Sequence, residues 1–219
     1  MDIQILSAES LGVRGLCCYV KTKQRTILID PGLALGYMRH KLLPHPKQVA
    51  MAERVRRKII SLWEKTTDIV FSHFHGDHVP LVDANPYQLH VKELAGLNSK
   101  AGIWCKNRDH LSSTEAARKE SLRTFLGLHF LPGEKVKHGP LHFSCAVPHG
   151  DPEITDESVM MTLVEEDRRF LHAPDIQLLH DQTVSLILEW HRIYFLPEVR
   201  LCIYPGSVKN KSTGPGKMP

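Results

Sequence analysis

The segment His73-Phe-His-Gly-Asp-His78 constrains this chain more than any other part of its sequence. It brings four potential metal ligands together directly after residues 68–72, an apolar run typical of a buried strand. Imidazoles and a carboxylate suit a borderline divalent ion such as Zn²⁺, and the absence of cysteine among them favours a catalytic site over a structural one. The alternative is a histidine-rich loop in a chain with 14 histidines, but scattered surface histidines are not expected at this spacing.

The spacing inside this segment divides its ligands into two pairs. Alternate side chains of an extended segment share a face, so His73 and His75 can bind the same ion. Asp77 and His78 follow Gly76, where the chain can turn, and they are expected to point toward a second ion beside the first. The segment therefore predicts a site for one or two metal ions.

Size and composition predict one reduced, soluble domain. The chain has 219 residues, of which 42% are hydrophobic, enough for a single substantial core. Its formal charge of +4 is compatible with an anionic substrate but too small to indicate nucleic acid. Its five cysteines lack CxxC spacing, which argues against a disulfide framework or a zinc ribbon. Neither a secretory leader nor an 18-residue apolar run is visible, so a cytoplasmic protein without a membrane span is expected.

Strands that end in a histidine or an aspartate recur along the chain. Apolar periodicity predicts helices at residues 49–63, 112–126 and 181–190, the second with Ser113 or Thr114 near its cap. It predicts strands at residues 3–6, 15–21, 25–30, 69–72, 103–106, 141–147, 159–164 and 169–172. Four of these strands lead into Asp30, the 73–78 segment, His149 and Asp175, so we expect these groups to converge at one edge of a sheet.

These landmarks resemble the metallo-β-lactamase fold superfamily. The resemblance rests on Ile-Asp30-Pro-Gly, the HxHxDH segment, Val-Pro-His149-Gly and His-Ala-Pro-Asp175, in that order, over residues 1 to about 190. The amino-acid sequence of residues 8–14, 29–36 and 170–177 is similar to that of an uncharacterised, mainly archaeal branch of that superfamily.

The resemblance implies an α/β fold, a four-layer αββα sandwich with a metal site at one edge of its two sheets. It implies that Asp30 orients a ligand through a hydrogen bond. It assigns a role to each remaining ligand: His73, His75 and His149 on the first metal, Asp77 and His78 on the second, and Asp175 bridging both. Asp77 or Asp175 would orient the attacking hydroxide. His172 precedes Asp175 by three residues but points away from it in a strand, so we expect His172 in the core or behind the ligands.

The C-terminal part departs from this pattern. The superfamily has a final metal-binding histidine well beyond the position of Asp175, but only His180 and His191 follow it here, both bordering the expected helix. Residues 207–219 are polar and rich in glycine and proline, and they are expected to form a disordered tail. We therefore expect a truncated or frameshifted domain at residues 1–206 with an incomplete C-terminal half, whose exposed sheet edge would favour self-association.

The sequence predicts a metal-dependent hydrolase in which one or two Zn²⁺ ions, or Mn²⁺ or Fe²⁺, activate a water molecule. The substrate is expected to be a small molecule, either an ester, a thioester, a lactone or a phosphodiester, because the resemblance fixes the chemistry better than the substrate. A nuclease is disfavoured by the modest charge. The alternative is a catalytically impaired metal-binding remnant that lacks the last ligand of the site.

Overall fold

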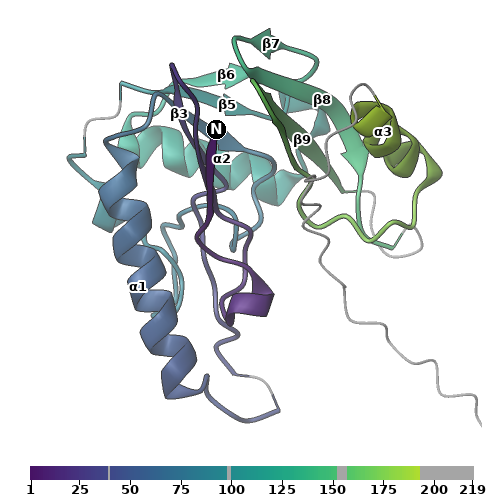
Figure 1. The fold of residues 1–219 in the computed structure, drawn as a ribbon. Helices are drawn as coiled ribbons and strands as arrows, with labels where there is room; N and C mark the ends of the chain where they lie inside the picture. Colours follow the sequence, from purple (N-terminus) through teal and green to yellow (C-terminus); the bar gives the residue numbers. More distant parts are fainter. Residues whose placement is uncertain (39, 98–99, 152–156, 193–219) are drawn as a thin grey trace, which may run out of the picture.

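The computed structural model describes residues 1–38, 40–97, 100–151 and 157–192. Within these ranges the chain forms a mixed α/β fold with two β-sheets and three α-helices (Figure 1). The expected domain end at residue 206 and the expected tail at 207–219 lie outside the described residues, as does Cys202. Among the four described cysteines, Cys17, Cys18 and Cys105 are buried.

The first sheet has six strands and is parallel over the half that leads to the candidate site. Strands β1 and β2 run antiparallel to their neighbours, whereas β3 to β6 are mutually parallel. In β3, Leu28 faces one side of the sheet while Ile27 and Ile29 face the other, and all three are buried. Burial on both faces explains the continuous apolar runs in the sequence. In spatial order the strands are β1 (Asp2–Ile5), β2 (Cys18–Lys21), β3 (Thr26–Ile29), β4 (Asp68–Phe71), β5 (Gly102–Cys105) and β6 (Phe130–Pro132).

The second sheet has four antiparallel strands. The order is β10 (Arg169–His172), β9 (Ser158–Glu165), β8 (Leu141–Pro148) and β7 (Lys137–His138). The hairpin of β9 and β10 was predicted from the sequence, whereas β6 and β7 were not, because strands of three and two residues are too short to show a period. The pairing of β8 with β9 shifts register between Phe143 and Ala146.

All three predicted helices are present: the first begins three residues earlier than its apolar period suggested, the second one residue later, and the third at the predicted residue. Helix α1 (Pro46–Trp63) begins with a proline at its first position, after the capping residue His45. Helix α2 (Ser113–Leu126) is capped by Ser112, and Ser113 and Thr114, which the sequence placed near the cap, are its first two residues. The Ser112 hydroxyl accepts from the Glu115 amide, and the Glu115 carboxylate accepts from the Ser112 amide. The remaining helices are α3 (Asp181–Arg192) and the 3₁₀ turns η1 (Glu9–Leu11), η2 (Val91–Leu94) and η3 (Arg108–His110).

Three apolar clusters connect these elements. One contains residues of α1 and α2 and of one face of the six-stranded sheet, and the second joins the two sheets. The third joins the four-stranded sheet to Ile187 of α3, on the opposite side of the molecule from α1 (Figure 1). Among the described helices none is both long and apolar enough to span a bilayer.

Two glycines allow the HxHxDH loop to lie directly against earlier loops. A Cβ atom at Gly32 would come 2.3 Å from the carbonyl carbon of His78, and one at Gly15 would come 2.2 Å from the backbone carbonyl oxygen of Asp77. Since no side chain fits at such distances, these positions require glycine. The backbone contacts bring the loop after β3 and the loop before β2 to the end of β4.

Candidate metal centre

The end of β4 carries the HxHxDH segment into a position fixed by both sheets. Ser72 follows β4, and its carbonyl accepts a hydrogen bond of 2.9 Å from the Met160 amide of β9. The Val70 carbonyl of β4 accepts one of 2.8 Å from the Asp30 amide, just beyond β3. His73 is therefore placed, fully buried, where the carboxyl ends of β3 and β4 meet the second sheet.

The imidazoles of His73, His75, His78 and His149 and the Asp175 carboxylate form a cluster. Asp30 lies beside it and makes three hydrogen bonds, two to Ser72 and one to His78. Its carboxylate accepts from the Ser72 amide at 2.7 Å and from the Ser72 hydroxyl at 2.6 Å. It also lies 2.9 Å from Nδ1 of His78, which leaves the Nε2 atom of that ring for the centre of the site. Asp30 has the left-handed backbone angle φ 48°, which aspartate tolerates better than most residues.

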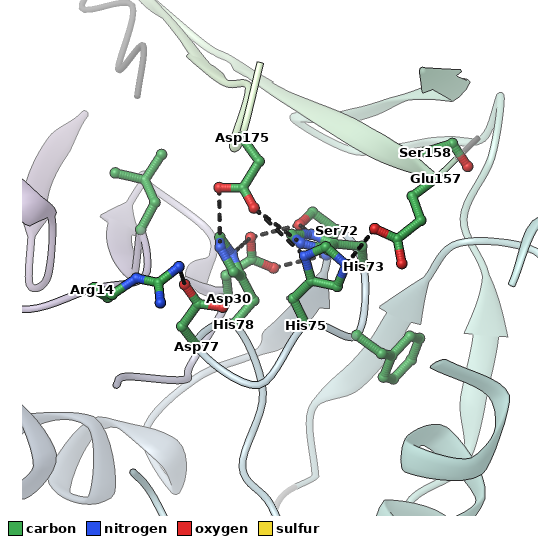
Figure 2. Close-up of polar contacts among 12 residues, drawn as sticks. Arg14, Asp30, Ser72, His73, His75, Asp77, His78, Glu157, Ser158 and Asp175 are labelled. Carbon is green, nitrogen blue, oxygen red and sulfur yellow. Dashed lines mark hydrogen bonds and ion pairs between the residues drawn. The ribbon is translucent and has the colours of Figure 1, made fainter. Parts of the chain in front are cut away.

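Asp175 lies at the middle of the cluster, as Figure 2 shows. One of its carboxylate oxygens is 3.3 Å from His73 Nε2 and 3.8 Å from His75 Nδ1. The other oxygen is 3.3 Å from His78 Nε2. Asp175 also has a left-handed φ of 56°, and strained conformations of this kind concentrate at functional sites. Its position between imidazoles of both predicted pairs is the one expected of a bridging ligand.

His149 completes the cluster from the end of β8. It is 5% exposed, and its Nε2 atom is buried without a hydrogen-bond partner among the described residues. Its ring lies 5.4 Å from each of the rings of His73 and His75, and all three offer ligand atoms within 4.8 Å of one another. A second such group consists of Asp30, His73 and His78.

The histidines of the cluster differ in protonation. Burial, together with the nearby charge of His78, lowers the pKa of His73 to about 4. Burial likewise lowers the pKa of His149 to about 4. Burial also disfavours the charged form of His78, but the carboxylates of Asp175 and Asp30 outweigh it and raise the pKa of His78 well above its usual value. At neutral pH the first two rings are thus neutral and able to donate a lone pair, whereas His78 carries a proton.

The pKa of the Asp175 carboxylate is also shifted by the surrounding groups. Burial alone would raise the pKa of Asp175, but the charge of His78 and hydrogen bonds from His73 and His75 hold it well below its usual range. Asp175 is therefore ionised and available as an anionic ligand.

Each histidine of the segment has an outer partner on the nitrogen that faces away from the cluster. The Ser72 hydroxyl is 2.8 Å from His73 Nδ1, and the Glu157 carboxylate is 3.0 Å from His75 Nε2. Such partners fix ring orientation and tautomer in metal sites. The sequence analysis assigned no role to Ser72 or Glu157. Ser72 could have been found from its position immediately before His73, whereas no spacing signal marks Glu157.

A buried ion pair lies behind the segment. Glu115 of α2 accepts from the Phe74 amide at 3.0 Å, and Arg118 donates to the Phe74 carbonyl at 2.9 Å, so α2 holds the backbone between His73 and His75. Lys106, which follows β5, contacts Glu115 at 3.0 Å and the Ser158 carbonyl at 2.6 Å.

The structure does not bring every predicted residue into the cluster. Asp77 lies 3.6 Å from the Arg14 guanidinium and belongs to neither group of possible metal ligands among the described residues, so its roles as a ligand and in catalysis stay predictions. His172 is buried behind the site, 2.8 Å from the Leu16 carbonyl and 3.9 Å from Asp30, as expected of a core or outer residue. His180 contacts the Gly150 carbonyl. The side chain of His191 lies outside the described part of the chain.

Comparison with known proteins shows similarity to a group of archaeal proteins. No family model matches the chain. It is 49% identical over 192 residues to a UPF0282 protein of Methanosarcina mazei, covering 87% of this chain and 63% of that protein. It is 31% identical to UPF0282 proteins of Thermococcus onnurineus and Pyrococcus furiosus, in each case over 86% of this chain and over 66% and 64% of theirs. Most of this chain is thus similar to archaeal UPF0282 proteins.

The chain spans between 63% and 66% of the length of these UPF0282 relatives. Nothing in these comparisons supports the expected truncation or frameshift. Among solved structures, the isothiocyanate hydrolase from Delia radicum gut bacteria aligns with a TM-score of 0.45 and 15% identity, over 81% of this chain and 66% of that one. At that level of similarity the alignment bears on neither reaction nor substrate.

Proposed function

We propose that this chain carries the metal site of a hydrolase that cleaves small ester, thioester, lactone or phosphodiester substrates. The observation that carries the proposal is the convergence of imidazole nitrogens on the Asp175 carboxylate, each ring of the HxHxDH segment being held by an outer partner. The proposal includes the metallo-β-lactamase-like αββα arrangement, and the three apolar clusters between successive helical and sheet elements support it.

The residues present fit a divalent metal. A buried imidazole nitrogen without a partner, such as His149 Nε2, is costly unless something binds it. Nitrogen and carboxylate donors without thiolates suit Zn²⁺, with Mn²⁺ or Fe²⁺ as alternatives. His73, His75 and His149 would hold one ion and Asp77 and His78 a second, with Asp175 shared by both. Ions bound there would supply Lewis acidity and lower the pKa of a water molecule.

The side chains of the chain itself would hold and orient the reactants. Asp175 is ionised, so it can accept a hydrogen bond from the attacking water and direct its lone pair. The cluster lies where buried strand ends meet, and Asp30, His73 and His78 are at most 1% exposed, which limits competing solvent on that side.

Metal content and hydrolysis together test the proposal. The purified chain should bind about one to two equivalents of Zn²⁺, Mn²⁺ or Fe²⁺ after dialysis and hydrolyse 4-nitrophenyl esters or bis(4-nitrophenyl) phosphate. His75→Ala should lose both properties, whereas His129→Ala, which removes an exposed histidine, should keep both. Failure to take up any of these metals would overturn the proposal. Metal uptake without turnover of any substrate class would favour the alternative of an impaired metal-binding remnant.

A further inference from the structure

A hollow of about 350 Å³ lies beside the HxHxDH segment and takes no part in the cluster described above. It is bounded by η1 and the residues that follow it, by the loop after β3, and by the start of α1. Its volume is in the range of pockets that bind small organic ligands.

The hollow and the metal centre share Arg14. Arg14 lines the hollow, and its guanidinium lies 3.6 Å from the Asp77 carboxylate, next to His78 in the chain (Figure 2). A molecule in the hollow would therefore lie against Arg14, which contacts the HxHxDH segment at Asp77. This continuity relates the hollow to the substrate of the proposed hydrolase.

The charges at this end do not favour an anion. The Arg14 guanidinium lies between two carboxylates, 3.4 Å from Glu9 and 3.6 Å from Asp77, so its positive charge is already compensated. An incoming phosphate or carboxylate would meet the Glu9 and Asp77 charges as well as that of Arg14. The hollow thus suits an uncharged group.

The remaining wall mixes polar and apolar side chains: it includes His40 and Gln48, and also two leucines that are unusually open to solvent. Leu42 and Leu43 are 71% and 61% exposed, and they line the hollow together with Val13, Leu35 and Pro44. Adjacent exposed leucines at the mouth of a hollow are a feature of ligand sites, because ligand binding removes their surface from water.

We propose that this hollow binds the aliphatic acyl group of an uncharged carboxylic ester or thioester, while the scissile bond lies at the metal centre. The proposal rests on the proposed function and names its substrate class. In the reaction the oxygen of water forms a bond to the acyl carbon and the carbon–oxygen or carbon–sulfur bond breaks. The leaving alkoxide or thiolate takes up one proton of the water, the acyl group departs as a carboxylate, and the second proton is released to solvent.

A chain-length series with matched variants tests the proposal. The Zn²⁺-loaded full chain is assayed with 4-nitrophenyl acetate, butyrate, hexanoate and octanoate. The value of kcat/KM should rise by at least about twofold per added methylene, since full burial of a methylene corresponds to about fourfold. Leu43→Asp should lower kcat/KM for the octanoate about tenfold and leave the acetate unchanged. Leu179→Asp, at an equally open leucine outside the hollow, should change neither.

A binding measurement separates this proposal from the proposed function. Octanamide is uncharged and resists hydrolysis, and its binding can be followed by saturation-transfer NMR with or without metal. Binding that Leu43→Asp weakens, without turnover of any ester, thioester, lactone or phosphodiester, would support an apolar site here and overturn the hydrolase assignment. Ester hydrolysis that is independent of chain length, or octanoate turnover that Leu43→Asp leaves unchanged, would overturn the acyl site. Preference for bis(4-nitrophenyl) phosphate over every ester would also overturn it.

Discussion

Replacing Lys106 by methionine should be one of the most destabilising single changes in this fold. The Lys106 side chain is fully buried, and its ammonium group donates to the carboxylate of Glu115, itself 2% exposed, and to the Ser158 carbonyl. Methionine fills similar space but leaves the Glu115 charge buried without a counter-ion. Removing one partner of a buried pair costs about 3–5 kcal/mol, a large part of the total stability of a domain, which is about 5–15 kcal/mol.

The double variant Lys106→Met/Glu115→Gln isolates the cause of this loss. Glutamine retains an oxygen for the Phe74 amide, and no unpaired charge remains. The amide nitrogen of glutamine cannot accept from the Ser112 amide, so one capping interaction is lost, at a cost of about 1 kcal/mol. The double variant should therefore exceed Lys106→Met in unfolding free energy by at least about 2 kcal/mol.

Urea denaturation of the metal-free proteins, followed by circular dichroism, gives these differences directly. Glu120→Gln serves as the control, because it removes a charge from the solvent-exposed face of the same helix and should leave the midpoint unchanged. If the double variant is as unstable as the sum of the two single changes, the unpaired charge is not the source of the loss and the reasoning fails.

Three further predictions concern the centre itself. Asp30→Asn should weaken Zn²⁺ binding about ten- to a hundredfold, whereas His75→Ala should abolish it, as measured by competition with a chromophoric chelator; equal loss in both would place Asp30 among the direct ligands. Because the pKa of His78 is raised, metal binding should release its proton near neutral pH and become tighter as the pH rises, which calorimetry in buffers of different ionisation enthalpy detects; binding without proton uptake by the buffer would contradict the assignment. Gly32→Ala should destabilise the fold by about 1–3 kcal/mol in thermal unfolding, because its Cβ would lie 2.3 Å from the backbone of His78; an unchanged melting temperature would contradict that contact.

The convergence of the ligands could be predicted because it depends on local patterns. Parallel strands with continuous apolar runs end at the same edge of a sheet, so the residues that follow them meet there. Asp30 and His73 follow β3 and β4 in this way, while His149 and Asp175 follow strands of the second sheet. The elements that carry the site were accordingly placed within a few residues of their observed bounds.

The outer partners could not be predicted, because they depend on contacts between residues far apart in the chain. Glu157 contacts His75 across 82 positions, and Lys106 meets Glu115 only because β5 and α2 pack behind the same loop. The pairing of Asp77 with Arg14 has the same origin. A period in the sequence reports which face of an element is buried, but it does not report which polar group of another element lies opposite.

The protonation of His78 explains how the cluster keeps its geometry in the metal-free fold. Its ring lies between the carboxylates of Asp30 and Asp175, at 2.9 Å and 3.3 Å, so a single imidazolium partly balances two negative charges, one buried and one partly buried. This contribution to stability is complete below the unfolded pKa of about 6.5 and is lost as the pH rises through the raised folded value. A metal ion bound as proposed would displace the proton and supply the same sign of charge at the same place, while the neutral rings of His73 and His149 would need no deprotonation. Charge therefore holds these side chains near one another, so that binding of the proposed metal would require little reorganisation.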